Sequence, residues 1–530
     1  MDYDVIVVGG GVAGLIATAY LSKTGRTTLL CEKEPACGGL VNSFVRDGFI
    51  YDGGIRAMEN SGVLFPMLKH LGLELKFVKN HISIGIEDQI IRVEREENLA
   101  DYQALLSGLY PENQAEIDAI TTQIKRIMHY MKVQYGINNP IFLDMKQDRE
   151  YMLKKVLPWM VQYLRTAPKI SALNEPVVDF LQRYTRNQSL LDIITQHFFQ
   201  STPAFFALSY LKLYLDYHYP LGGTGQFVEK LVGFIQAHQG SIRTGTEIRR
   251  VDAQNRLVVD AHGNTYGYQR LIWAADLNAF YRAIDFQQIK QPKVIQAITQ
   301  RQAELQGKTG NDSVFTLYLG TTLAPQYFAS RHSEHFFYTP SRAGQSQAGP
   351  LPLNAPRQAI ERWLRQFFAL TTYEISIPVL RDRTLAPEGK TGLVISVLFD
   401  YQLTRTIQED GWYEEFKTLC EDCILDTLEA SIYPGIRQAV EQRFSATPLT
   451  MERHAGTTQG AITGWAFTNQ PMPAESRLPK IMSAIRTPVP GVYQAGQWTY
   501  SPSGLPISIL TGKLAADRVS RELPKKKSNK

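Results

Sequence analysis

The chain has 530 residues, of which 44% are hydrophobic and 20% are charged, and its formal net charge is +5. This length predicts two or three domains, and the composition is typical of a folded globular protein. The small net charge and the lack of a Lys/Arg stripe interleaved with aromatic residues argue against nucleic-acid binding.

The first residues show no sign of a secretory signal, because an apolar run follows Met1 to Asp4 without a basic region or a cleavage site. The sequence contains no run of about 18 apolar residues, so we expect no membrane-spanning helix. These features favour a cytoplasmic protein. The basic tail at 525–530 is interpreted as a solvated end, with contact to an anionic membrane surface as the alternative.

Residues 4–34 form the most informative local pattern. A continuous apolar strand over 4–8 is followed by a Gly-x-Gly-x-x-Gly motif and by a helix of small and apolar residues over 13–21. A second strand is predicted over 28–31, and Glu32 stands at its end. A strand, a glycine motif, a helix and an acidic residue in this order predict a bound dinucleotide.

Each part of this motif has a physical role in binding. Gly9 permits a tight turn, Gly11 lets the backbone approach a pyrophosphate, and Gly14 lets the helix pack closely on the strand. The N-terminus of the helix offers free N–H groups and a positive dipole end to the phosphates. Glu32 can accept hydrogen bonds from both hydroxyls of an adenosine ribose. The alternative, a turn that only happens to contain glycines, leaves Glu32 unexplained.

Two glycine-rich segments after Glu32 indicate which dinucleotide is bound. The pair Gly38-Gly39 is followed by Leu40, and the segment 48–56 reads Gly-Phe-Ile-Tyr-Asp-Gly-Gly-Ile-Arg. At these residues the chain resembles the glutathione-reductase-type FAD-binding fold. The resemblance implies that the Gly-Gly turn follows the diphosphate and ribityl chain of FAD, and that the Asp-x-Gly segment approaches the isoalloxazine. A Rossmann domain that binds only a nicotinamide cofactor does not need these segments.

A FAD domain of this type also needs a middle segment, and strands predicted within 240–275 supply it. The resemblance implies that the backbone of Ile248 clasps the adenine. The glycine-rich run 222–225 is not a second dinucleotide site, because it follows Tyr-His-Tyr-Pro rather than a buried strand. We interpret it as a turn that caps a helix over 226–236, so no NAD(P)H-binding half is expected.

The segment 494–512 reads as a tight turn followed by a helix that begins near Ile507. The resemblance implies that Gly504-Leu505-Pro506 brings backbone N–H groups to the pyrimidine edge of the flavin. The helix would direct its positive end at N1 and O2, where reduced flavin carries negative charge. The alternative is an ordinary loop before a terminal surface helix.

The remaining sequence is typical of a substrate domain. A hairpin is predicted over 81–93, and strands over 313–320, 372–378 and 392–399 indicate a mostly antiparallel sheet. Residues 100–221 are largely helical in their period, and their aromatic-rich stretches are interpreted as core rather than as a pocket.

Two helical patterns raise further possibilities. The helix over 152–165 combines Trp, Met and Leu with Lys and Arg, which suits an interfacial membrane contact. We favour the alternative, an amphipathic helix that packs on its own domain. A lone CxxC pair, Cys420 and Cys423, lies in another helical pattern, where both thiols are expected to pack as small hydrophobic groups. No metal site is expected.

Nearly the whole chain resembles the amine-oxidase and phytoene-desaturase superfamily, and most closely its carotenoid desaturase, carotenoid isomerase and retinol saturase branch. One departure is Arg56, because relatives of this type often have His there. Arg56 is the catalytic candidate: its charge could fix an anion or the cofactor, but a guanidinium that stays protonated cannot be a general base. The residues that carry the resemblance are Asp52-Gly53-Gly54-Ile55-Arg56, Tyr219-Pro220-Leu221-Gly222-Gly223, Leu385-Ala386-Pro387-Glu388-Gly389-Lys390, Thr447-Pro448-Leu449-Thr450 and Gly491-Val492-Tyr493-Gln494-Ala495-Gly496-Gln497.

The resemblance implies hydride transfer between flavin N5 and a carbon of an apolar, polyene-like lipid, with a quinone or oxygen as electron acceptor. Such a substrate would enter a buried tunnel from a membrane face. No base is identified, and Tyr338, His335 and Glu59 are candidates by residue type only. Two alternatives stay open: a flavin amine oxidase, for which Trp498 and Tyr500 would form half of an aromatic cage, and a flavoprotein that uses FAD for non-redox isomerisation.

We therefore predict an α/β fold, in which a glutathione-reductase-type, Rossmann-like FAD-binding domain joins a substrate domain with a mixed or antiparallel sheet and a helical insertion. The expected FAD-binding domain comprises residues 1–80, 222–285 and 455–530, the substrate domain 81–99 and 286–454, and the helical subdomain, with its alternative membrane contact, 100–221. The expected FAD-binding residues are Gly9, Gly11, Val12, Ala13, Gly14, Glu32, Lys33, Gly38, Gly39, Leu40, Gly54, Ile55, Arg56, Ile248, Gly496, Gln497, Gly504, Leu505, Pro506 and Ile507.

Overall fold

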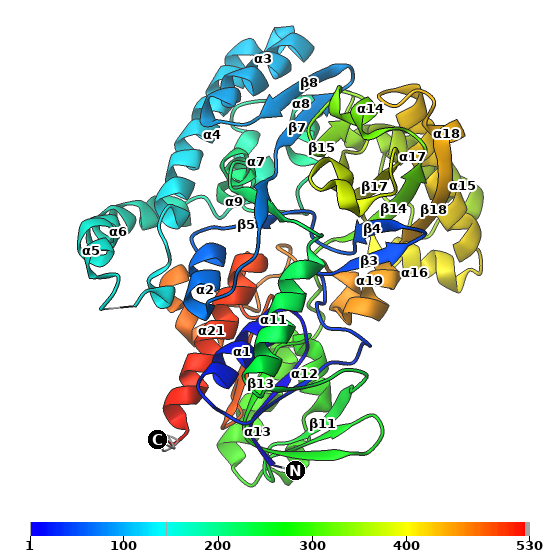
Figure 1. Ribbon diagram of the computed structural model, residues 1–530. Coiled ribbons are helices and arrows are strands. Elements are labelled where there is room, and N and C mark those ends of the chain that lie inside the picture. The colour runs from blue at the N-terminus through cyan, green and yellow to red at the C-terminus, as the bar shows by residue number, and fades with distance from the viewer. Residues whose placement is uncertain (1, 145, 525–530) are drawn as a thin grey trace.

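The computed structural model describes residues 2–144 and 146–524. Two seven-stranded sheets dominate the fold, and helices pack on both of them (Figure 1). The first sheet lies at the bottom of the view, the second lies at the upper right, and a group of helices rises at the upper left. The predicted α/β class is confirmed.

The first sheet has a parallel centre built from strands that are distant in the sequence. β1 pairs in parallel with β2 and with β13, and β19, near the C-terminus, also pairs in parallel with β13. Every residue of β2 is buried, as expected for a parallel strand that is covered on both faces. Antiparallel strands complete one edge. In sheet order the strands are β10 (Ser241–Arg243), β2 (Thr28–Cys31), β1 (Asp2–Val8), β13 (Thr265–Trp273), β12 (Leu257–Asp260) and β11 (Ile248–Asp252), with β19 (Val492–Gln494) beside β13.

The helix that follows β1 joins the two ends of the chain. All residues of α1 (Val12–Lys23) except Lys23 are buried, and α11 (Gly225–Ala237) and α21 (Leu505–Glu522) pack on it. A Cβ on Gly512 of α21 would lie 2.5 Å from the Ala13 carbonyl oxygen, so the close contact of α1 with α21 requires glycine. Other helices near this sheet are α2 (Leu64–Leu71), α12 (Leu277–Ala283), α13 (Pro292–Leu305) and α20 (Ile481–Ala484).

The second sheet is antiparallel except where β15 pairs with β7. The hairpin and the three strands predicted for this region are confirmed, whereas β15 is a strand that the sequence pattern did not indicate. In sheet order the strands are β18 (Val440–Ala446), β14 (Ser313–Thr321), β17 (Thr391–Phe399), β16 (Tyr373–Ser376), β15 (His335–Thr339), β7 (Ile82–Ile86) and β8 (Gln89–Val93). The helices of this region are α14 (Pro325–Ala329), α15 (Arg357–Leu370), α16 (Tyr401–Glu409), α17 (Tyr413–Ala430), α18 (Ile436–Ala439) and α19 (Pro448–Ala455).

Smaller elements connect these parts. A hairpin precedes the Asp-x-Gly segment, and a three-stranded sheet lies between the helical region and the first sheet. Both thiols of the CxxC pair are buried in α17, so their packing role is confirmed. The hairpin consists of β3 (Ser43–Arg46) and β4 (Phe49–Asp52), and the three-stranded sheet has the order β5 (Met58–Glu59), β9 (Tyr217–Pro220) and β6 (Phe77–Lys79).

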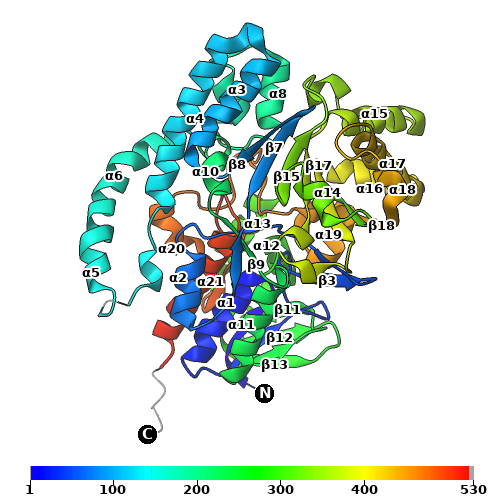
Figure 2. The same cartoon turned by 45° about the horizontal axis from the view of Figure 1, so that its top comes forward.

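The helical region carries a projecting arm, residues 149–171, which Figure 2 shows at the left. Within the described ranges, no helix is long and apolar enough to cross a membrane. The basic tail at 525–530 lies outside the described residues. The helices of this region are α3 (Leu99–Leu109), α4 (Gln114–Tyr135), α5 (Arg149–Tyr151), a π-helical turn (Met152–Val156), α6 (Leu157–Ser171), α7 (Val177–Leu181), α8 (Gln188–Thr195), α9 (Ala204–Leu208) and α10 (Tyr210–Tyr214).

The arm is apolar on two sides. On the inner side Val156 is buried, and Trp159 donates its indole N–H to the Val133 carbonyl of α4 at 2.5 Å. The favoured prediction, packing on the protein's own domain, is right for this side only. The outer side carries an exposed stripe at helical spacing, in which each side chain is 44–66% exposed: Leu153, Leu157, Met160, Val161 and Leu164.

Candidate active site

The turn between β1 and α1 holds the three glycines of the first motif. Gly9 has φ +103°, and a Cβ on Gly14 would lie 1.9 Å from the Gly9 carbonyl oxygen, so the protein's own packing requires both glycines. Gly11 differs, because its φ is −69° and nothing lies within 4 Å of an added Cβ. The space beside Gly11 is therefore open to a ligand.

Helix α1 offers its N-terminus to this space. No side chain caps the helix at Gly11, and its first turn, with Val12 and Ala13, contains no acidic residue. Its free N–H groups and positive dipole end suit a phosphate. Gly38 donates its N–H to the carbonyl oxygen of the residue before Gly11 at 2.9 Å, and Gly39 packs on Gly11. The Gly-Gly turn thus follows the same edge.

Glu32 stands directly after β2, with 8% of its surface exposed. Its carboxylate accepts backbone hydrogen bonds from Gly10 at 2.6 Å and from Glu34 at 2.9 Å. A carboxylate has about four acceptor positions, so two hydroxyls can still bind it. The Thr246 N–H donates to the Glu32 carbonyl oxygen at 2.7 Å, which brings the start of β11 at Ile248 close to this residue.

The next predicted segments run side by side. Ile55 donates its N–H to the Leu40 carbonyl oxygen at 3.0 Å. A Cβ on Gly54 would lie 2.0 Å from that same oxygen, so this contact requires glycine. The Gly-Gly turn therefore leads directly to the Asp-x-Gly segment.

The C-terminal segment reaches α1 from the other side. Gly496 donates its N–H to Thr511 Oγ1 at 2.9 Å, and a Cβ on Gly496 would lie 3.4 Å from the Ala13 Cβ. Gln497 follows, and its carbonyl oxygen packs on Gly464. The structure therefore brings both ends of the chain to the same turn.

Helix α21 begins at Leu505, two residues before the predicted start near Ile507. The predicted helix is confirmed, and its first turn includes Pro506, whose missing N–H costs nothing there. Gly504 is the N-cap and has φ 164°, which is extended backbone and does not require glycine. The nearest atom to an added Cβ would be Glu59 Oε1, at 3.7 Å. As at Gly11, the protein itself does not explain the glycine.

Two predicted side chains are held by the protein itself. Lys33 donates to a backbone carbonyl of α19 at 2.5 Å. Arg56 is 6% exposed, donates to the carbonyl oxygens of Asp52 and Gly54, and places one guanidinium nitrogen 2.9 Å from Ser396 Oγ. The side chain of Arg56 thus links the Asp-x-Gly segment to the second sheet.

These features fit an elongated dinucleotide along the edge from Glu32 to Gly504. The space beside Gly11 is open, and the N-termini of α1 and α21 both lack a side-chain cap. In the described part of the chain, Arg56 Nε and Asn42 Oδ1 are buried without a hydrogen-bond partner. A bound ligand that offers both acceptors and donors would satisfy such groups. The role of each residue stays a prediction.

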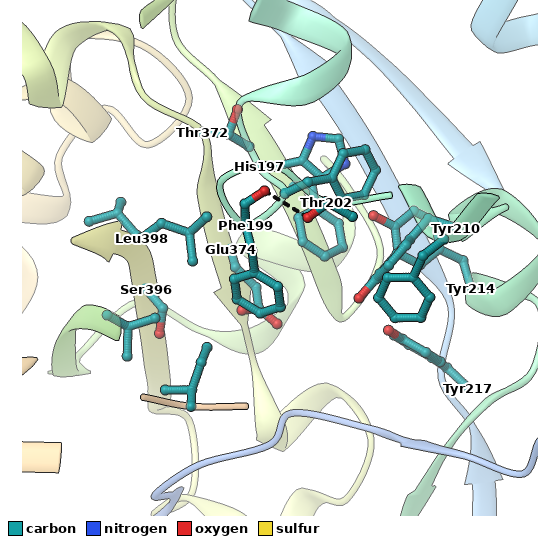
Figure 3. Close-up of a pocket in the computed structure, with 16 residues that line it drawn as sticks. His197, Phe199, Thr202, Tyr210, Tyr214, Tyr217, Thr372, Glu374, Ser396 and Leu398 are labelled. Atoms are coloured by element: carbon teal, nitrogen blue, oxygen red, sulfur yellow. Dashed lines mark hydrogen bonds between the residues drawn. The ribbon is translucent and has the colours of Figure 1, made fainter. Parts of the chain in front are cut away.

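An aromatic cavity lies between the second sheet and helices α9 and α10 (Figure 3). Its volume is about 130 Å³, below the ~300–1,000 Å³ of most small-molecule sites, so it has room for only part of a larger ligand. The aromatic-rich stretch that the sequence analysis interpreted as core is only partly core. Phe205 and Leu208 are buried in the core, whereas Phe206, Tyr210 and Tyr214 line the cavity. The lining includes His197, Phe198, Phe199, Phe206, Tyr210, Tyr214, Tyr217, Phe337, Glu374, Ser396 and Leu398.

A hydrogen-bonded pair stands on the sheet side of this cavity, where His335 Nε2 lies 2.9 Å from Glu374 Oε1. Burial lowers the pKa of His335. Burial opposes ionisation of Glu374, but the hydrogen bond from His335 and the charges of Arg56 and Arg381 outweigh it, so the pKa of Glu374 is lowered. Burial thus disfavours protonation of the imidazole, whereas the surroundings of Glu374 favour the ionised form of its carboxyl.

The candidate bases occupy different places. Tyr338 is fully buried on the opposite face of β15 from His335, because side chains alternate along a strand. Glu59 lies beside the start of α21. Trp498 packs edge-on against another tryptophan at 4.8 Å, and neither it nor Tyr500 is among the residues that line the cavity. The structure thus does not bring these two aromatic residues into a cage there.

Sequence reasoning missed two polar residues of the cavity and left Asp52 without a role. Glu374 and Ser396 reach the cavity from β16 and β17, and polar residues within largely apolar strands were the available signal. Asp52 is 1% exposed, accepts a hydrogen bond from Tyr219 at 2.7 Å, and accepts two more from Thr224. It ties the Asp-x-Gly segment to the turn before α11.

Comparison with known proteins adds independent findings. A family model described as flavin containing amine oxidoreductase matches residues 12–343. The chain is 23% identical over 551 residues to the chloroplastic prolycopene isomerase of Daucus carota, covering 98% of this chain and 80% of that protein. It is 21% identical over 545 residues to a 4,4'-diapophytoene desaturase of Staphylococcus aureus, covering 98% and 99%.

Solved structures share the fold. A redesigned putrescine oxidase superposes with a TM-score of 0.61 at 14% sequence identity, covering 98% of this chain and all of that one. At this identity the likeness shows the architecture alone.

Proposed function

The chain belongs to the flavin containing amine oxidoreductase family and is a FAD-dependent enzyme, and we propose that it transfers hydride between FAD and a carbon atom of a polyene-like substrate. This transfer would form or reduce a carbon–carbon double bond. The observation that carries this proposal is the aromatic cavity. It lies beside Ser396, which binds Arg56 of the predicted flavin segment. The relatives named as a prolycopene isomerase and a 4,4'-diapophytoene desaturase support a substrate of this class.

The electrostatics of the cavity suit an uncharged substrate. No Lys or Arg stands among the described residues that line it, and burial lowers the pKa of His197 to about 4, so this ring is neutral at pH 7. The Glu374 carboxylate is hydrogen-bonded to His335 and lies within the influence of the positive charges of Arg56 and Arg381. Because these charges offset that of the carboxylate, the cavity lacks an uncompensated anion for an ammonium group, and this favours a polyene over an amine.

FAD, when bound, supplies a hydride acceptor or donor. We propose that the N-termini of α1 and α21 bind its phosphates and its pyrimidine edge, and that Glu32 binds its ribose. The ring faces of Tyr210, Tyr214 and Phe337 would orient a conjugated chain and exclude water. A quinone or oxygen is the proposed electron acceptor.

We also propose that the exposed stripe of the arm contacts a membrane surface, from which an apolar substrate would reach the protein. The stretch 149–171 contains five basic residues and one acidic residue, Glu150. An apolar stripe with basic neighbours suits an anionic bilayer surface. The basic residues are Arg149, Lys154, Lys155, Arg165 and Lys169.

The reaction is tested by mixing the anaerobic holoprotein with 4,4'-diapophytoene or with putrescine and recording the visible flavin absorbance. We expect bleaching by the polyene, blocked by Leu398→Trp, which fills the cavity. Leu351→Trp, at an exposed position, is the matched control. Bleaching by the amine alone would assign an amine oxidase, and a change in polyene geometry without any flavin redox change would assign an isomerase.

A further inference from the structure

Glu59 lies in the small three-stranded sheet, directly opposite a residue that lines the aromatic cavity. Glu59 in β5 is paired directly with Tyr217 in β9, and Tyr217 lines the cavity. Directly opposed residues of an antiparallel pair project their side chains to the same side. The side chain of Glu59 therefore points to the same side of the small sheet as that of Tyr217. Figure 3 shows Tyr217 at the cavity.

The same carboxyl reaches the first turn of the C-terminal helix. Glu59 Oε1 is the nearest atom to a Cβ position on Gly504, at 3.7 Å, and Gly504 is the N-cap of α21. Glu59 thus lies beside the helix end to which the pyrimidine edge of FAD is assigned, and its strand partner Tyr217 lines the cavity.

The surroundings of Glu59 leave its carboxyl uncommitted. It has no hydrogen-bond partner within the described ranges, in contrast to Glu374, which is bonded to His335. Burial, with Asp216 as a second cause, raises the pKa of Glu59 to about 7. The other titratable groups that face it are the phenols of Tyr135, Tyr210 and Tyr217, whose pKa values burial also raises. A carboxyl of this kind exchanges a proton readily near neutral pH.

We propose that Glu59 is the residue that takes the proton from, or returns it to, the substrate, an inference that rests on the proposed function. In desaturation, one C–H bond of the substrate breaks, and its hydrogen leaves with both electrons as a hydride that FAD would accept. The neighbouring C–H bond breaks to give its proton to the Glu59 carboxylate, and its electron pair forms the new C=C bond. Saturation is the reverse, with the protonated carboxyl as donor.

The test compares Glu59→Gln with Glu59→Asp and with wild type, each as holoprotein. Infrared titration should show one carboxyl that ionises near pH 7 in wild type and is missing from Glu59→Gln. Asp216→Asn removes a neighbouring negative charge, so this titration should move to lower pH. We expect Glu59→Gln to keep its FAD and to lose about 100-fold or more in polyene turnover. Glu59→Asp should regain part of the loss.

The pH profile supplies the second readout. Because proton removal needs the carboxylate, desaturation by wild type should increase as pH rises through 7, and saturation should decrease; Glu59→Gln should lose this inflection. Wild-type turnover or an unchanged pH profile in Glu59→Gln overturns the assignment of Glu59 alone. A wild-type holoprotein that converts no polyene in either direction overturns the proposed function, and the assignment of Glu59 with it.

Discussion

At the first βα turn, three glycines within five positions of one another serve different partners. Gly9 and Gly14 are needed because the protein's own backbone occupies the space where a Cβ would stand, whereas Gly11 faces open space. Gly54 resembles Gly9 and Gly14, because the Leu40 backbone occupies the space of its Cβ, whereas a Cβ on Gly504 would find room, as on Gly11. Gly11 and Gly504 are therefore the positions where we expect FAD to approach the backbone.

Gly11→Ala should weaken FAD binding without weakening the protein. The added methyl meets nothing in the protein, so the melting temperature of the apoprotein should stay the same. It would overlap a diphosphate at the start of α1, which should lower FAD affinity by about 10- to 100-fold. Flavin fluorescence titration measures the affinity.

Gly14→Ala is the matched control, because its methyl would lie 1.9 Å from the Gly9 carbonyl oxygen. It should lower the melting temperature even without FAD. Normal FAD affinity in Gly11→Ala would mean that no phosphate lies against this turn.

At the scale of elements, two helix ends and one helix face are the places where we expect other molecules to bind. α1 and α21 both begin at a glycine N-cap without a side-chain cap. The arm buries Val156 of its π-helical turn on the inner side and exposes a stripe on its outer side. The N–H groups of the two helix ends can bind a ligand, and the exposed stripe can meet a surface.

Gly504→Val should make the potential of the bound flavin more negative and weaken FAD binding. A branched side chain at the N-cap would move the first turn of α21 away from the pyrimidine edge. Interactions with a helix end contribute about 0.3–2 kcal/mol, which sets the expected loss. Redox titration with a reference dye measures the potential.

Gly504→Ala provides a graded control for this change. Its Cβ would find ordinary contacts at 3.7 Å and 3.9 Å, so both variants should fold. An effect that increases from Ala to Val supports close approach of the flavin. Normal FAD content and potential in Gly504→Val would leave this turn as an ordinary loop.

Leu157→Glu with Leu164→Glu should reduce binding of the protein to anionic lipid vesicles. Each leucine is exposed on the outer stripe, and burial of such a side chain contributes about 1.5–3 kcal/mol. We expect a loss of about tenfold or more in the vesicle partition coefficient, measured by flotation. Trp159 is a poor target, because its indole is bonded to α4.

Gln162→Glu is the control for charge, because Gln162 is exposed on the same helix and lies outside the stripe. It should reduce vesicle binding only slightly. Equal losses in both proteins would show that net charge, and not the apolar stripe, controls the association.

At the scale of the whole molecule, the proposed FAD site joins segments that are far apart in the chain. The edge runs from Glu32 past Gly11 and Ile55 to Gly504, and Ile248 lies beside Glu32. A ligand that binds all of them should act as a brace between the two ends of the chain, because it binds the folded state and not the unfolded one.

FAD should therefore raise the melting temperature of the apoprotein in a concentration-dependent way. At a free concentration about a hundred times Kd, the stabilisation is about 2.7 kcal/mol. Differential scanning fluorimetry measures the shift. FMN lacks the adenosine that Glu32 would hold, so it should stabilise the protein less; equal shifts from FMN and FAD would count against the assignment of Glu32.

The sequence by itself determined the strand–glycine–helix unit over 4–34 and most strands of the second sheet. Their signals are local: apolar runs, glycine spacing and strand alternation within a few residues. It also indicated FAD, because the motifs expected to contact this cofactor are short and carry their own backbone geometry. It did not settle the start of α21, since a proline in a first turn looks the same as one that precedes a helix.

Only the tertiary structure decided which polar side chains meet. Glu374 and Ser396 meet at the cavity because β16 and β17 pair these two residues, and the pairing of β5 with β9 sets Glu59 opposite Tyr217. The same pairing placed Tyr338 on the far side of its sheet and divided the aromatic stretch between core and cavity. Which face of a strand or helix is covered depends on long-range packing, and no local pattern contains that information.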